Sequence, residues 1–322
     1  SAASEYLKAA LISEDPEIAE RAAGVAVSAG EWQMAALASD RWAMLAPENL
    51  DARELAAASR LREGDYVGAE FQFARIIELT ASDPERGWQI IMSLLAPVND
   101  KVRANKVLDN LQKDFDAESD VNALYARSQI SARFGDLVTS TMYIDRAILE
   151  DPDRAELYAW AGRLAVNNGN ASLALKRYRQ GWKLDPREPQ IAMAYAELLK
   201  RNNDLPAAQK VLGKLPDTPD MRFARLVFAL DAGDRDGAEK LYKGFGKARY
   251  EDASESAYFA AQSAELLDYQ REAISWYEQV TGERSLRSTI RMAFLLAGLG
   301  EIEESRRLLV QLRSSEEVGV QT

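Results

Sequence analysis

A column of turn residues recurs along the whole chain at intervals of 30 to 36 residues. Every member is Gly, Asn or Asp: Gly30, Gly64, Asn99, Gly135, Gly169, Asn203, Gly233, Asp268 and Gly300. Gly and Asn adopt the left-handed backbone conformation that ends a helix most easily, and Asp tolerates it better than most residues. The next residue is acidic or Asn in every repeat except at Tyr269, and such side chains cap the start of a helix. The pattern predicts helix–turn–helix hairpins from end to end.

Two further columns describe how each predicted hairpin packs. Five residues after each turn stands a small side chain, which lets two antiparallel helices approach closely: Ala35, Ala69, Ala104, Ser140, Ala174, Ala208, Ala238, Ala273 and Ser305. Four positions later, on the same helical face, stands a larger apolar or aromatic residue in all repeats but that of Ser39: Phe73, Leu108, Ile144, Tyr178, Leu212, Tyr242, Tyr277 and Leu309. The columns predict an all-α, right-handed superhelical solenoid of about nine hairpins.

Five residues carry a family resemblance: Tyr158, Gly162, Ala174, Tyr178 and Pro186. Their pattern and the 34-residue spacing resemble the tetratricopeptide repeat (TPR), and the resemblance covers nearly the whole chain. It implies a single solenoid over residues 1–322, with the first helix of each hairpin lining a concave groove. A lone second helix at residues 3–13 precedes the hairpins and indicates a fragment of a longer array. Near residues 213–253 the interval shrinks to 30 residues, and we expect an irregular short repeat there, without a domain boundary.

The composition argues against catalysis and against several ligand classes. The chain contains neither Cys nor His, which removes Ser-His-Asp and Cys-His nucleophilic systems and Cys/His zinc sites. Its net charge of −11 has the wrong sign for nucleic acid, which needs a basic footprint. No apolar run approaches the length of a membrane-spanning helix. The sequence predicts a protein that is not an enzyme, has no catalytic, cofactor-binding or metal-binding residues, and does not insert into a membrane by this segment.

Three local features could suggest a ligand site or a modification site, and for each we favour a structural explanation. Residues 114–120 resemble the start of a calcium loop, but Ser119 and Tyr125 stand where an EF-hand needs Gly and Glu, so we interpret them as a connection between repeats. Asn170 opens a glycosylation triplet, yet it also stands where the repeat requires a helix cap. The six Trp residues lie mostly at helical spacing beside the core columns, which favours packing.

For the predicted groove, two interpretations remain open: a protein-binding site or an ordinary solvent-exposed surface. In the standard repeat register its lining comprises Tyr125, Gln129, Arg163, Asn167, Met193, Glu197, Lys200, Arg201, Tyr258 and Gln262. Tyr and Arg are favoured anchors at protein interfaces. Chaperone-binding family members clamp a peptide carboxylate with basic and Asn residues in two groove columns. Only Arg163 is basic at the equivalent positions here, so we do not expect a receptor for chaperone tails.

A narrower resemblance lies in two stretches of the chain. Residues 6–10, 15–22 and 42–47 form one, and residues 273–282 and 291–296 form the other. Together they resemble large TPR lipoproteins of the proteobacterial outer membrane. The resemblance implies a non-catalytic adaptor that brings a periplasmic carboxyl-terminal processing protease together with murein hydrolases, in a full-length protein that is periplasmic and anchored to the outer membrane. The lipidated N-terminal Cys of such proteins is absent from this sequence. A passive TPR scaffold in a cell-envelope assembly, such as polysaccharide export, remains the alternative.

Overall fold

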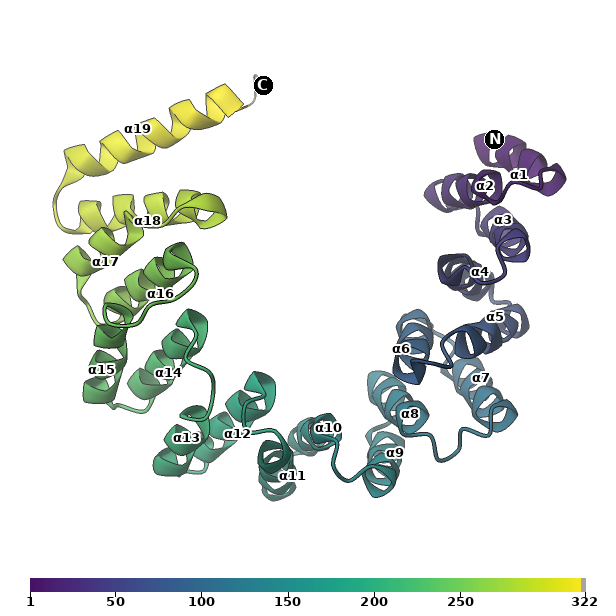
Figure 1. Cartoon of the computed structure of the whole chain (residues 1–322), viewed down its shortest axis with the longest axis horizontal. Helices are drawn as coiled ribbons and strands as arrows, with labels where there is room; N and C mark the ends of the chain where they lie inside the picture. The colour runs from purple at the N-terminus through teal and green to yellow at the C-terminus, as the bar shows by residue number, and fades with distance from the viewer. Residues whose placement is uncertain (320–322) are drawn as a thin grey trace. The chain divides into compact units, whose positions relative to one another are not determined.

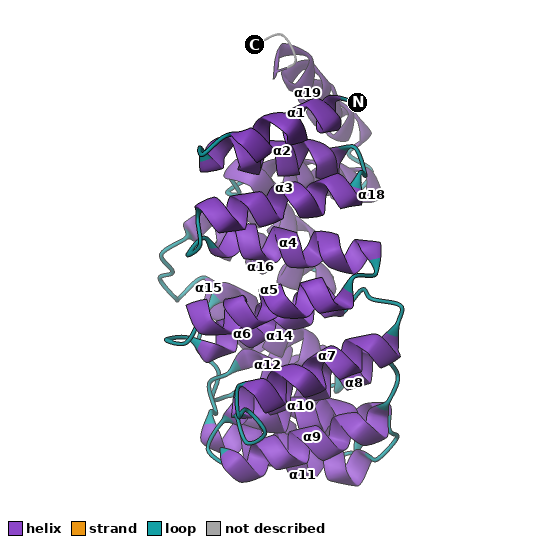
Figure 2. Ribbon diagram, turned by 90° about the vertical axis from the view of Figure 1, so that its right-hand side faces the viewer, coloured by secondary structure: helices purple, strands orange, loops and turns teal. Residues whose placement is uncertain are grey.

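The fold is all-helical in the part of the chain that the structure describes. The computed structural model describes the backbone of residues 1–319 and the side chains of residues 1–313. Within these residues there are nineteen α-helices, one short 3-10 helix and no strand (Figures 1 and 2). Eighteen of the α-helices follow α1 (Ala2–Ile12) as nine consecutive pairs, and the two helices of each pair pack closely on each other except those at Pro84–Leu95 and Lys101–Asp114. The predicted number of hairpins and the lone leading helix are confirmed.

The chain divides into two compact units, Ser1–Leu184 and Asp185 onward. The first unit contains α1 and five hairpins: α2 (Pro16–Ser28) with α3 (Trp32–Leu45), α4 (Leu50–Glu63) with α5 (Tyr66–Leu79), α6 (Pro84–Leu95) with α7 (Lys101–Asp114), α8 (Val121–Arg133) with α9 (Leu137–Glu150), and α10 (Ala155–Asn167) with α11 (Ala171–Leu184). All five second helices have 14 residues. The second helices of the first unit therefore have a uniform length.

The second unit contains four hairpins: α12 (Pro189–Arg201) with α13 (Leu205–Leu212), α14 (Pro219–Asp231) with α15 (Arg235–Phe245), α16 (Ala253–Leu266) with α17 (Gln270–Tyr277), and α18 (Ser285–Gly298) with α19 (Ile302–Gly319). The 3-10 helix Gly282–Arg284 precedes α18. Here α13, α15 and α17 have only 8, 11 and 8 residues. The shortening thus begins before residue 213 and extends beyond residue 253. A single solenoid over residues 1–322 stays a prediction.

Eight of the nine residues in the turn column have the left-handed backbone conformation, with a positive φ. Gly64, Asn203 and Asp268, for example, have φ values of 77°, 59° and 68°. Asn99 is the exception, because α6 ends at Leu95 and a longer connection leads to α7. The turn column also missed two left-handed positions: Asp116 between α7 and α8, with a φ of 53°, and Gly282 before α18, with a φ of 72°.

Most of the predicted caps form. The Oδ1 atoms of Asp65, Asp136 and Asn170 accept hydrogen bonds from backbone N–H groups three residues ahead, at 2.9, 3.0 and 3.0 Å. The capping interpretation of Asn170 is therefore confirmed. Glu31 and Tyr269 make no such bond. The caps satisfy backbone donors that the first turn of a helix leaves unpaired.

The packing columns also form as predicted. All nine small residues are buried, and the larger residues four positions later are buried with two exceptions. Tyr242 is half-buried, and Leu309 is 45 % exposed because its helix, α19, packs mainly against α18. Ser39, the exception in the sequence pattern, is buried and donates its hydroxyl to the Ala35 carbonyl at 2.7 Å. The core of each unit therefore follows the repeat period.

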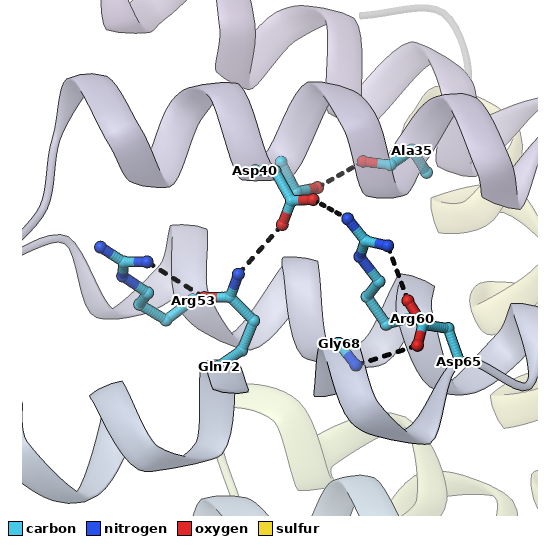
Figure 3. A network of polar contacts seen from close by, with 8 residues as sticks. Ala35, Asp40, Arg53, Arg60, Asp65, Gly68 and Gln72 are labelled. Carbon is cyan, nitrogen blue, oxygen red and sulfur yellow. Dashed lines mark hydrogen bonds and ion pairs between the residues drawn. The ribbon is translucent and has the colours of Figure 1, made fainter. Parts of the chain in front are cut away.

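A buried polar network joins α3, α4 and α5 (Figure 3). The Arg53 guanidinium donates to Gln72 Oε1 at 3.1 Å and to the Ala43 carbonyl at 3.0 Å. The Gln72 amide donates in turn to Asp40 Oδ1 at 3.0 Å. Arg60 forms ion pairs with Asp40 and with the cap residue Asp65. The repeat columns did not predict this network, because Asp40, Arg53, Arg60 and Gln72 lie outside them and only Asp65 belongs to one.

The contact between α10 and α11 gives a stability prediction at Gly162. A methyl group at this position would lie 2.7 Å from two ring atoms of Tyr178, which is itself buried. Alanine favours a helix over glycine by about 1 kcal/mol, but overpacking costs about 1–3 kcal/mol. We expect Gly162→Ala to lower the free energy of unfolding by about 1 kcal/mol, measured by chemical denaturation.

The matched background is Tyr178→Leu, which removes the ring. There, Gly162→Ala should be neutral or stabilising, because only the helix propensity remains. An equal loss in both backgrounds would contradict the contact.

Candidate functional site

The first helices of the hairpins lie along one side of the first unit. Figure 1 shows α2, α4, α6 and α8 on this side and α3, α5, α7 and α9 on the other. The second, fifth, sixth and ninth residues of α2, α4, α6 and α8 line two clefts on this side. The repeat therefore places equivalent positions side by side. We call this surface the first-helix face.

Two predicted groove residues, Tyr125 and Gln129, line the smaller cleft, which has a volume of about 310 Å³ between α6, α8 and α10. Its other walls include Trp88 and Met92 of α6. Burial raises the pKa of the Tyr125 hydroxyl, while a hydrogen bond with Gln129 opposes the shift. Tyr125 is half-buried: it packs against the core cluster around Ile144 and also lines the cleft. We call this the tyrosine cleft.

Arg163 is a third predicted groove residue. The Trp160 ring is a common neighbour of its guanidinium and of the Tyr125 ring. The guanidinium carbon of Arg163 is 5.5 Å from the centre of the Trp160 ring. The Tyr125 and Trp160 rings pack edge to face, with centroids 6.4 Å apart. Tyr125 and Arg163 therefore both lie beside the Trp160 ring, and their shared role in binding stays a prediction. Asn167 is exposed at the end of α10 and lines neither cleft.

Sequence reasoning missed Arg154, which stands just before α10. Its guanidinium donates to Asn122 Oδ1 at 2.7 Å and to Glu85 Oε2 at 2.9 Å. It also lies 5.8 Å from the centre of the Tyr125 ring. Arg154 therefore joins α6, α8 and the start of α10 at the tyrosine cleft. The repeat columns gave no signal for it, because it stands outside the helical pattern.

The other predicted residues lie on α12 and α16 in the second unit. Lys200 and Arg201 form ion pairs with Glu197 at 2.8 and 3.1 Å, so these three side chains are engaged with one another. Met193 is half-buried on the same helix. Their role in protein binding stays a prediction.

Tyr258, on α16, departs from the expected groove lining. It is 7 % exposed and packs against Tyr277, with ring centroids 6.3 Å apart. Its hydroxyl accepts a hydrogen bond from the half-buried Gln262 amide at 3.2 Å. The ring belongs to the core of the second unit because α17 covers it.

The larger cleft, which the sequence analysis did not identify, has a volume of about 1130 Å³ between α2, α3, α4 and α6. Its lining combines an apolar floor with an acidic rim. The floor includes Val25, Ala29, Trp42, Leu55, Ala58 and Leu94, and the rim consists of Glu17, Glu20, Asp51 and Glu54 with Arg21 as the only base. We call it the acidic cleft.

A sequence signal for the acidic cleft did exist. Glu17 and Asp51 are 34 residues apart, and so are Glu20 and Glu54. The acidic pair therefore recurs at the repeat period on two consecutive first helices. The columns of turns and small residues describe how the helices pack. They do not include the charged positions on the first-helix face.

Two bases lie near the acids of the rim without forming a close ion pair: Arg21 lines the same cleft, and Arg86 interacts electrostatically with Glu54. No ion pair to the four acids forms among residues 1–313, whose side chains the structure describes. Burial raises the pKa of the Glu54 carboxyl and repulsion from Asp51 adds to it, whereas Arg86 opposes the shift. The rim is therefore a region of concentrated negative potential beside apolar surface.

The described residues contain no group of three or more Asp or Glu side chains placed to hold a metal ion. Among them, no helix combines the length and the apolar character needed to cross a membrane.

No protein-family model matches the chain. A curated protein, the probable biofilm formation methyltransferase WspC of Pseudomonas putida, is 33 % identical over 66 residues. The match covers 20 % of this chain and only 16 % of the methyltransferase.

Several solved structures resemble the chain at low sequence identity. Yeast Tom70 is 15 % identical with a TM-score of 0.40, and the alignment covers 97 % of this chain and 87 % of Tom70. A tetratricopeptide repeat protein from Parabacteroides merdae is 11 % identical, covering 77 % and 98 % with a TM-score of 0.38. The human IFIT1 dimer with m7Gppp-AAAA is 13 % identical, covering 94 % and 72 % with a TM-score of 0.46. The chain's own period, left-handed turns and packing columns show a repeat of helical hairpins.

Proposed function

We propose that this chain is a non-catalytic scaffold that binds other proteins. The observation that carries the proposal is the first-helix face of the first unit, where equivalent positions of successive helices form two open clefts. Stacked hairpins leave such a face uncovered because each repeat needs contacts only with its neighbours. Tyr125 in the tyrosine cleft and the exposed Arg163 of α10 supply the aromatic and guanidinium groups that concentrate binding energy at interfaces.

The more specific proposal is an adaptor between a periplasmic carboxyl-terminal processing protease and murein hydrolases. Its support is the resemblance to outer-membrane TPR lipoproteins of residues 6–10, 15–22 and 42–47 and of residues 273–282 and 291–296. On this proposal the full-length protein is periplasmic and anchored to the outer membrane. Tethering two partners on one scaffold raises their effective concentration and can strengthen a weak encounter by about 10²–10⁴. The adaptor then accelerates proteolysis without contributing a catalytic group.

The test is a reconstituted degradation reaction that contains the protease, a murein hydrolase and this chain. We expect degradation to require the chain. Replacing both Tyr125 and Arg163 with Ala should weaken binding by about 1–3 kcal/mol, since interface energy concentrates in a few Tyr and Arg side chains.

The matched control replaces two exposed basic residues of α11, Lys176 and Arg179, with Ala. Both variants should retain the helical signal of the unmodified chain, and the control should retain its activity. Degradation that runs equally fast without the chain would reject the adaptor function. Degradation that needs the chain but ignores the Tyr125/Arg163 variant would reject only the choice of residues.

A further inference from the structure

The acidic cleft carries charges that the folding of α2 and α4 does not explain. Glu17 and Asp51 stand in the first turns of their helices, where a negative charge is favourable because of the helix dipole. Glu20 and Glu54 stand one turn further along, where that effect has faded. Their carboxylates form no ion pair among residues 1–313. The repeat needs neither charge for its own stability.

Glu54 is unfavourable for the isolated chain. It is half-buried, and burial together with the neighbouring Asp51 raises its pKa. A carboxylate at such a place costs folding free energy unless a cation compensates it. Residues that weaken the isolated fold in this way often stand at functional sites. Arg86 offsets part of this cost, and a positive charge on a bound partner would offset more of it.

The shape and floor of the cleft define the rest of the occupant. Its volume of about 1130 Å³ is large enough for several amino-acid side chains. Trp42, Leu55 and Leu94 supply apolar surface at its base, and burial of such surface is worth about 25 cal/mol per Å². A ligand that carries only positive charge would leave the apolar side chains of the floor exposed to water. The cleft matches a chain segment that combines cationic and apolar side chains.

We propose that the acidic cleft binds a cationic segment of a partner protein, whose Arg or Lys side chains contact the carboxylates of Glu20 and Glu54. An apolar side chain of the same segment lies on the floor formed by Trp42 and Leu55. Complementary charge of this kind steers a partner toward the site and selects against acidic segments. The inference rests on the proposed protein-binding function and names the chemistry of the partner at one part of the first-helix face.

The test uses the full chain and three fluorescein-labelled peptides of equal length. In the first, leucines alternate with arginines, and in the other two the arginines are replaced by glutamates or glutamines. Fluorescence anisotropy should show the cationic peptide binding most tightly. Its affinity should fall as salt rises from about 0.15 M to about 1 M, because the screening length shrinks from about 8 Å to about 3 Å.

The variant Glu20→Gln with Glu54→Gln should weaken binding of the cationic peptide about tenfold. Its matched control, Glu48→Gln with Glu150→Gln, removes the same charge from exposed positions outside the cleft and should bind as the unmodified chain does. If the first variant does not fold, as judged by its thermal unfolding, Glu17→Gln with Glu20→Gln serves instead, because both side chains are exposed.

Three results would overturn the inference. One is tighter or equal binding of the glutamate or glutamine peptide, and another is unchanged affinity in the cleft variant. The third is a dimer of this chain that the cleft variant abolishes in sedimentation, which would assign the cleft to a second copy. These results concern the cleft alone, whereas degradation that proceeds without the chain would reject the adaptor function.

Discussion

Ala174→Trp is expected to unfold the hairpin of α10 and α11. Ala174 is fully buried on α11, at the position where the repeat requires a small side chain. Overpacking a core commonly costs about 1–3 kcal/mol, and an indole adds far more volume than the methylene groups on which that range rests. We expect a loss of at least about 3 kcal/mol in the free energy of unfolding, measured by chemical denaturation.

The matched control is Ser172→Trp, which places the same side chain at an exposed position of the same helix. It should change the stability little, because exposed substitutions usually stay within about 0.5 kcal/mol. Equal unfolding curves for the two variants would mean that the packing column is misplaced. A loss confined to Ala174→Trp would tie the small-residue column to the contact between paired helices.

The second large effect is expected at Arg53, which is buried together with Gln72 in the network between α3, α4 and α5 (Figure 3). Arg53→Met keeps most of the aliphatic volume and removes the guanidinium. Gln72 Oε1 and the Ala43 carbonyl then lose their donor. Hydrogen bonds to a charged group contribute about 1.5–3 kcal/mol, and buried acceptors left without a partner add their desolvation cost. We expect a loss of about 3 kcal/mol in the free energy of unfolding.

Two comparisons isolate the polar contribution at Arg53. Arg62→Met changes an exposed arginine of the same helix, whose guanidinium carbon lies 5.4 Å from the centre of the Trp32 ring, and should cost about 1 kcal/mol or less. Adding Gln72→Leu to Arg53→Met should recover part of the loss, because an apolar pair replaces a half-satisfied polar one. Additive losses from Arg53→Met and Gln72→Leu would show that the two side chains are not coupled.

The functional residues were harder to predict than the hairpins. Tyr125 and Gln129 lie in a cleft as the repeat register predicted, and Arg163 lies beside them against Trp160. Tyr258 was assigned by the same register, yet α17 and its Tyr277 cover it. Register places a residue on a helix face, but it does not say how closely the next helix approaches that face.

The sequence by itself determined the repeat, the turns and the packing columns of this protein. A left-handed turn at Gly64 or Asn203 and a cap at Asp65 or Asn170 depend on residues only a few positions apart, so local chemistry decides them. Only the tertiary structure decided which surfaces stay open and which charges of residues 1–313 form no close ion pair. The acidic cleft combines side chains from α2, α3, α4 and α6. Its shape depends on how neighbouring hairpins stack, and no local pattern encodes the distance between helices that are a full repeat apart.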